Sequence, residues 1–123
     1  MCIICDGNYN ASTTSLECHK CPLLTTIPYL PLLTHLTCYE CPLLTSIPYL
    51  PLLTNLECYR CPLLTCIPNM PSLIHFGCYG LNLTTIPYLP VLNALECFNC
   101  TSLTNICNCP NLTYLDLGGG ANY

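Results

Sequence analysis

The sequence predicts a repeat solenoid that is mainly β, and three observations lead to that fold class. A phrase of about twenty residues recurs along the chain, as in LECHKCPLLTTIP at 16–28 and LECYRCPLLTCIP at 56–68. Leucine or isoleucine returns at fixed positions of the phrase, and all twelve prolines fall at only three of its positions. Such self-similarity is typical of a chain that stacks one structural unit on the next.

The repeat divides the chain into rungs, whose positions we number from 1 to 20. The fourth rung is one residue short, and the six rungs begin near Thr13, Leu33, Leu53, Leu73, Leu92 and Leu112. We therefore expect an N-terminal lead-in or cap at 1–12 and a C-terminal tail at 118–123. About five full rungs and a partial sixth are expected between them, at 13–117.

Positions 3–7 of each rung, such as 35–39, are predicted to form a strand because they contain no proline. Proline lacks the N–H group that a central strand requires. Alternation along the strand then points positions 4 and 6 into the core and positions 3, 5 and 7 outward. The returning part of the rung has prolines at positions 16 and 19, a spacing that excludes a helix and favours extended, polyproline-like backbone.

The pattern LxxLxCxxCxxLTxIPxLP resembles the leucine-rich repeat, across about residues 13–117. In its short length and its IPxLP ending, the repeat is similar to bacterial effector-type repeats. In its cysteines, it is similar to the Cys-rich repeats of giant DNA viruses. The resemblance implies a right-handed superhelix with a parallel sheet on the concave side and an extended, proline-rich convex side. It implies no catalytic residue, and it implies a protein-binding or scaffolding function.

Composition excludes several classes of function. Charged residues make up 7% of the chain and Lys and Arg number only 2, which argues against nucleic acid as a partner because its phosphates must be neutralised. No apolar run approaches the roughly 20 residues of a membrane span. The first residues lack the features of a signal peptide, so we expect a reducing, intracellular setting such as host cytoplasm or a virus particle. No pattern typical of a catalytic site stands out, and we expect no enzymatic activity.

The outward positions of the predicted strands carry the candidate binding residues. Position 7 forms a row of aromatic side chains, with histidines at position 3 and acidic residues at position 5. Aromatic residues often anchor protein interfaces, but stacked rings also stabilise a sheet, and both interpretations stay open. Position 8 alternates in charge along the first three rungs. The candidate protein-binding residues are Tyr39, Tyr59, Tyr79, Phe98, His35, His75 and Glu57.

Cysteines recur at positions 6 and 9 of the rungs, in a C-x-x-C spacing. The family pattern allows a small apolar residue at both positions without a metal, which favours cysteines that pack in the core. Zinc or an iron–sulfur cluster held by thiolates of adjacent rungs is the alternative cofactor, and disulfides between rungs are a third possibility. The candidate metal ligands are Cys18, Cys21, Cys38, Cys41, Cys58, Cys61, Cys97 and Cys100.

The remaining cysteines and the chain ends complete the prediction. Cys78 stands at position 6 of the fourth rung, and we expect this short rung to skip position 9. Five cysteines lie outside both positions, namely Cys2, Cys5, Cys66, Cys107 and Cys109. Neither end of the repeat has a polar capping helix in its sequence, so we expect end-to-end self-association as well as a protein partner. Threonines at position 13 are expected to hydrogen-bond the backbone of the turn.

Overall fold

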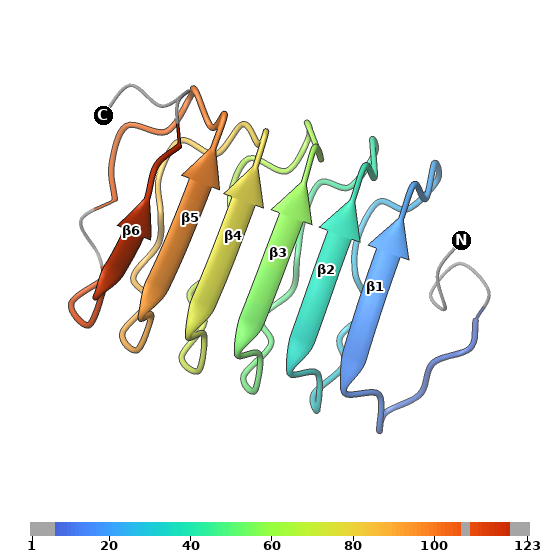
Figure 1. Ribbon diagram of the computed structural model, residues 1–123. Coiled ribbons are helices and arrows are strands. Elements are labelled where there is room, and N and C mark those ends of the chain that lie inside the picture. Colours follow the sequence, from blue (N-terminus) through green and yellow to red (C-terminus); the bar gives the residue numbers. More distant parts are fainter. Residues whose placement is uncertain (1–6, 107–108, 119–123) are drawn as a thin grey trace.

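The computed structural model describes residues 7–106 and 109–118, and it is a parallel β-solenoid of about five turns. The strands pair in chain order into one six-stranded parallel sheet, so that each strand is followed by its neighbour in space (Figure 1). They are β1 (Ser15–His19), β2 (His35–Tyr39), β3 (Asn55–Tyr59), β4 (His75–Tyr79), β5 (Ala94–Phe98) and β6 (Tyr114–Asp116). The mainly β repeat solenoid predicted from the sequence is therefore confirmed.

Residues one repeat apart lie opposite each other in neighbouring strands. Leu36 of β2 pairs with Leu56 of β3, and this register is kept along the sheet. The first five strands each span positions 3–7 of their rung, as the absence of proline predicted. Because neighbouring parallel strands lie about 4.8 Å apart, the periodicity of the sequence becomes a stack of side chains in space.

The core is a column of apolar side chains between the sheet and the returning segments. In β3 the inward residues Leu56 and Cys58 are buried while Asn55, Glu57 and Tyr59 are only partly so, which is the expected alternation. The second, third and fourth rungs each add leucine, isoleucine or methionine from positions 1, 12, 15 and 18 to the same cluster. The burial of these side chains opposes the entropy that the chain loses on folding.

The fourth rung corrects one sequence-based expectation. Position 9 is not skipped there, because Leu81 is buried at the place that Cys61 and Cys100 occupy in the neighbouring rungs. The missing residue belongs to the turn that follows, where Asn82 stands between the buried Leu81 and Leu83. The amide of Asn82 donates a hydrogen bond of 2.8 Å to the carbonyl of Pro62, which ties the shortened turn to the rung before it.

The residue after each of the first five strands has left-handed backbone, a feature that the sequence analysis missed. Position 8 has φ values of 53°, 50°, 52°, 65° and 56° at Lys20, Glu40, Arg60, Gly80 and Asn99. Four of these residues carry a Cβ atom and adopt this backbone at some energetic cost, because its carbonyl crowds the Cβ. The sharp turn redirects the chain from the sheet into the returning segment.

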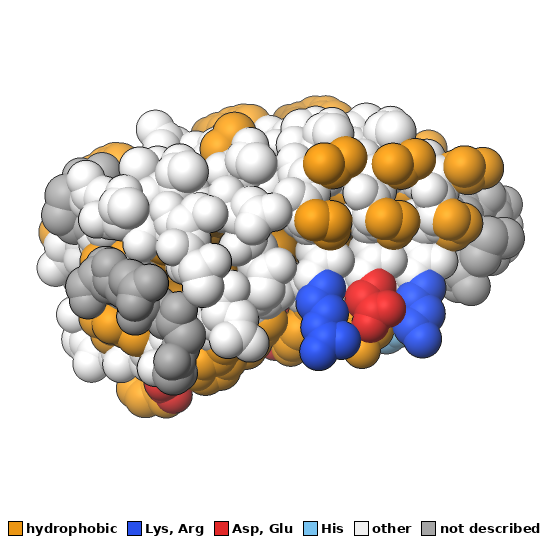
Figure 2. Space-filling view, turned by 90° about the horizontal axis from the view of Figure 1, so that it is seen from above, with side chains coloured by type: hydrophobic (Ala, Val, Ile, Leu, Met, Phe, Trp, Pro, Cys, Tyr) orange, Lys and Arg blue, Asp and Glu red, His pale blue; other side chains and the backbone are white. Residues whose placement is uncertain are grey.

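The loops after the strands form one long face of the molecule. Figure 2 shows the two basic side chains on this face with an acidic one between them, beside a group of apolar side chains. The basic residues are Lys20 and Arg60, and Arg60 lies 3.6 Å from the carboxylate of Glu40, as the alternating charges predicted. Exposed leucines at position 11, such as Leu23, occur in the first three rungs, whereas Ser102 holds that position in the fifth.

The returning segments contain no helix within the described residues, which agrees with the proline spacing. Isolated parallel bridges join Thr26 to Ser46 and Thr85 to Asn105. The hydroxyl of Thr45 donates to the carbonyl of Thr25 at 3.2 Å, which confirms the role predicted for position 13. In the part of the chain that is described, no helix has the length and apolar character needed to cross a membrane.

The last rung is incomplete. Leu115 of β6 is 41% exposed, whereas its register partner Leu95 in β5 is buried. Parts of the predicted cap and tail, residues 1–6 and 119–123, lie outside the described residues, and so do Cys2, Cys5 and Cys107. End-to-end association therefore stays a prediction.

Candidate functional site

The outward face of the sheet carries a continuous row of aromatic rings at position 7. Ring centroids of neighbours lie 5.7 Å apart from His19 to Tyr39, 5.6 Å from Tyr39 to Tyr59, and 5.1 Å from Tyr79 to Phe98. The closest pair is Tyr59 and Tyr79, at 4.4 Å with the planes only 5° apart. We call these five residues the aromatic row. It brings together Tyr39, Tyr59, Tyr79 and Phe98 as the sequence predicted.

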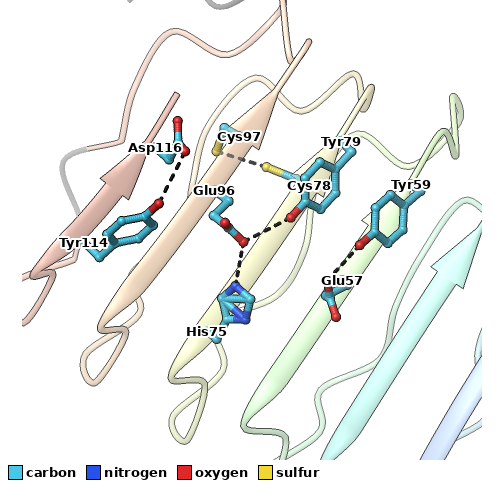
Figure 3. A network of polar contacts seen from close by, with 9 residues as sticks. All are labelled: Glu57, Tyr59, His75, Cys78, Tyr79, Glu96, Cys97, Tyr114 and Asp116. Carbon is cyan, nitrogen blue, oxygen red and sulfur yellow. Dashed lines mark hydrogen bonds and ion pairs between the residues drawn. The ribbon is translucent and has the colours of Figure 1, made fainter. Parts of the chain in front are cut away.

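Two rings of the aromatic row are fixed by hydrogen bonds, because their hydroxyls reach carboxylates at position 5. The hydroxyl of Tyr59 donates a hydrogen bond of 2.8 Å to Glu57 in the same strand. The hydroxyl of Tyr79 donates one of 3.0 Å to Glu96 in the next strand (Figure 3). Hydrogen bonds to ionised groups are stronger than neutral ones, so both rings are held in one orientation.

Glu96 joins residues from two strands. Its Oε1 atom accepts from Tyr79 and lies 3.0 Å from Nε2 of His75, so the two β4 side chains converge on one oxygen of β5. Side chains of His75 and Glu96 are each 26% exposed. The structure thus places two of the candidate binding residues, His75 and Tyr79, around an outward acid that was not among those candidates.

Gly77 explains how Tyr79 reaches across to β5. It holds position 5 of β4, and it is buried because the ring of Tyr79 covers it. A Cβ atom at Gly77 would lie 2.9 Å from Cε2 of Tyr79, closer than real Cβ contacts, and 3.1 Å from its hydroxyl oxygen, so the ring would have to shift. The absence of a side chain therefore makes the space in which Tyr79 lies flat, stacks on Tyr59 and meets Glu96.

The surroundings of Tyr59 and Tyr79 keep these two phenols protonated. Burial raises the pKa of Tyr79, and the hydrogen bond to Glu96 raises it further because ionisation would place two negative charges together. Burial and the bond to Glu57 raise the pKa of Tyr59 in the same way. Both hydroxyls therefore remain hydrogen-bond donors at neutral pH, a state suited to fixing the shape of a surface.

One further predicted residue, His35, and one further tyrosine–acid pair lie outside this network. His35 is exposed on β2, where its Nδ1 atom lies 2.9 Å from the hydroxyl of Thr34, and it takes no part in the network around Glu96. At the last strand the hydroxyl of Tyr114 lies 3.4 Å from Asp116, so a tyrosine meets an acid there too. The signal that could have identified Glu96 is the glycine that interrupts position 5 one rung earlier.

The strand and turn cysteines are buried in the core rather than placed on the sheet face. All eight predicted metal ligands have 0% exposure. Thiols at position 9 donate weak hydrogen bonds to the carbonyl of position 7 in the same rung, as Cys61 does to Tyr59 at 3.4 Å and Cys100 to Phe98 at 3.5 Å. These bonds give position 9 a role in the turn, and they support the interpretation of packed thiols.

The metal alternative has no site geometry in its support. Among the described residues, no three or more His, Cys, Asp or Glu side chains are arranged so that they could hold a metal ion. The proposal of zinc or an iron–sulfur cluster thus stays untested. Comparison of the chain with protein-family models, with curated proteins and with solved structures finds no match.

Proposed function

We propose that the protein is a binding or scaffolding module, without enzymatic activity, that holds a protein partner on the outward face of its sheet. The observation that supports this most is the aromatic row: five rings in mutual contact, partly open to solvent, along five strands. Aromatic side chains are enriched where interfaces gain most of their energy. The resemblance to the leucine-rich repeat, whose members commonly bind proteins, supports the same function.

Contacts within the protein hold two rings of this surface in place without a partner. Tyr59 and Tyr79 are fixed by stacking on each other and by their bonds to Glu57 and Glu96. Binding to side chains that are already ordered avoids much of the rotamer entropy that a flexible surface loses. The network around Glu96 therefore favours a recognition surface over a row that only stabilises the sheet.

The charge of the face indicates the chemistry of the partner. Position 5 carries four of the chain's six acidic residues, namely Glu17, Glu57, Glu96 and Asp116. Carboxylates beside aromatic faces suit a cationic side chain, which gains both ionic and cation–π attraction. We propose that the partner presents lysine or arginine side chains to this face.

Selection of peptides from a random displayed library tests the proposal. Peptides retained by the wild-type protein should be rich in arginine, lysine and aromatic residues. Replacing Tyr59 and Tyr79 together by alanine should raise their Kd by about tenfold or more, because each ring removed takes away an anchor. Isothermal titration of the selected peptides would measure this change.

A matched control uses tyrosines elsewhere on the molecule. Tyr29 and Tyr49 are 59% and 52% exposed and lie in the returning segments, away from the strands. Replacing both by alanine should leave Kd unchanged. Peptides that lose affinity equally with either double variant, or that bind the Tyr59 and Tyr79 variant as well as wild type, would refute the sheet face as the binding surface.

A further inference from the structure

Three buried thiols meet between the fourth and fifth rungs, behind the sheet face. The Sγ atoms of Cys78 and Cys97 are 3.0 Å apart (Figure 3). Cys100 donates to the carbonyl of Cys78 at 3.3 Å, so a third sulfur lies beside the pair. All three cysteines have 0% exposure. The aromatic row does not include them.

The backbone already satisfies the geometry of a covalent bond. Cys78 and Cys97 are register partners in the parallel strands β4 and β5, with both side chains pointing into the core. Neighbouring strands lie about 4.8 Å apart, which is inside the range of Cα separations, about 4.4–6.8 Å, that disulfides span. Joining the two sulfurs therefore needs rotation of side chains and no displacement of a strand.

We propose that Cys78 and Cys97 are a redox site that forms a reversible disulfide with a hydroperoxide as oxidant. One sulfur, as the thiolate, attacks a peroxide oxygen, the O–O bond breaks, and a sulfenic acid and water form once a proton is taken up. The second sulfur displaces water from the sulfenic acid and loses its proton, and the S–S bond forms. Two thiols are oxidised while hydrogen peroxide is reduced to two waters.

The size of the oxidant and the third thiol both suit this site. Hydrogen peroxide is small and uncharged, so it can reach buried sulfurs that a glutathione disulfide cannot approach. Hydrogen bonds from Cys78 and Cys97 lower the pKa of Cys100, while hydrogen bonds and burial raise the pKa of Cys78. Cys100 lies beside the pair, and once deprotonated it can attack the new disulfide, form a bond to one of its two sulfurs and release the other as a thiol.

The disulfide would connect the rungs beneath the candidate binding site. Cys78 lies between Gly77 and Tyr79 in β4, and Cys97 follows Glu96 in β5. The bond would fix these two strands where the Tyr79 hydroxyl already reaches Glu96. Oxidation is therefore expected to raise the melting temperature.

Mass spectrometry of the folded full chain after hydrogen peroxide treatment tests the proposal. Remaining thiols are blocked with N-ethylmaleimide under denaturing conditions, and peptic peptides are searched for a Cys78–Cys97 link. We expect that linked peptide, with a loss of two hydrogens that dithiothreitol reverses. Its absence from the treated wild-type protein, while other thiols have oxidised, would overturn the proposal.

Variants sharpen the test. Cys78→Ser should prevent the peroxide-induced rise in melting temperature, whereas Cys38→Ser, at the same position of a regular rung, should preserve it. Cys100→Ser should keep the Cys78–Cys97 link but slow its reduction by dithiothreitol. A link between Cys38 and Cys58 formed as readily as the proposed one would show that the pair has no special reactivity and would refute the inference. If Cys78→Ser does not fold, the peptide map of the wild type still decides.

Discussion

The second and third rungs are close copies of each other, whereas the fourth departs from the pattern at several positions. Rungs two and three share CPLLT and IP in their turns and pair without a gap. The fourth has Gly77 at position 5, Gly80 at position 8, Leu81 at position 9 and a shortened turn. The polar contacts around Glu96 and the close pair of thiols both lie where this irregular rung meets the fifth.

The comparison indicates that the regular rungs build the scaffold, whereas residues that depart from the repeat build the candidate site. A rung identical to its neighbours offers every side chain the same surroundings, so no residue gains a special contact. Removing the position 5 side chain at Gly77 opens space for Tyr79, and the acid of the next rung fills the far side of that space. The irregular rung is the place to test function.

The largest effect is expected from returning a side chain to position 5 of the fourth rung. Gly77→Thr gives the fourth rung the residue that Thr37 provides in the second. Repeat-restoring substitutions usually stabilise, but here the new Cβ meets the Tyr79 ring at 2.9 Å. We expect the free energy of unfolding to fall by about 1–3 kcal/mol, as for overpacked sites, measured by urea denaturation.

A double-mutant cycle isolates the cause. In a Tyr79→Ala background the ring is gone, so Gly77→Thr should cost little or should stabilise the strand. The coupling free energy between the two sites should reach about 1 kcal/mol or more, as expected of residues in direct contact. An equal loss in both backgrounds would mean that Gly77 is needed for some reason other than Tyr79.

The residues at position 8 share left-handed backbone, so they allow the rungs to be compared at one feature. Gly80 has left-handed backbone at low cost, whereas Lys20 has the same backbone with a side chain. Gly80→Ala should lower the free energy of unfolding by about 1 kcal/mol, because left-handed backbone costs other residues about 1–2 kcal/mol. Lys20→Gly should raise it by up to about that amount, less the entropy of the freer unfolded glycine.

Thermal and urea unfolding of both variants would check this pair. A new Cβ at Gly80 would have Cγ of Arg60 as its neighbour at 3.4 Å, an ordinary contact, so crowding does not confuse the result. Should both variants prove destabilising, the side chain of Lys20 would have to contribute more to stability than its backbone costs.

The repeat architecture was predictable because it depends on features that recur. Proline at fixed positions marks where a strand cannot be, and leucine at fixed positions marks the core. The repeat period therefore located the strands, including His35–Tyr39. The left-handed turn was not predicted, because Lys20 and Arg60 give no local signal for it, and glycine marks it only at Gly80. Likewise, Leu81 at position 9 could be placed only once its burial was seen.

The candidate site was predictable in part, for a related reason. The aromatic row follows from strand alternation, so Tyr39, Tyr59 and Tyr79 were found from spacing alone. The role of Glu96 depends on a contact between different positions of adjacent rungs, which a comparison of like positions does not reveal. Side-chain direction, and not periodicity, decides such contacts.

The smallest effect is expected from the hydroxyl of Tyr79. Tyr79→Phe keeps the ring on Tyr59 but removes the hydrogen bond to Glu96, so the free energy of unfolding should fall by about 0.5–1 kcal/mol at neutral pH. The substitution should also change how the free energy of unfolding depends on pH. The pKa of Tyr79 is raised in the folded protein above its unfolded value of about 10.

The stabilisation linked to this phenol is therefore complete below about pH 10 and is lost as pH rises toward the folded pKa, because the unfolded chain releases its proton first. Melting temperatures at about pH 8 and about pH 11 should differ less for Tyr79→Phe than for wild type. Tyr59→Phe should act in the same direction, since the pKa of Tyr59 is raised as well. A Tyr79→Phe variant that loses stability in alkali as steeply as wild type would show that its bond to Glu96 is not maintained in solution, and the fourth rung would then be no more specialised than the third.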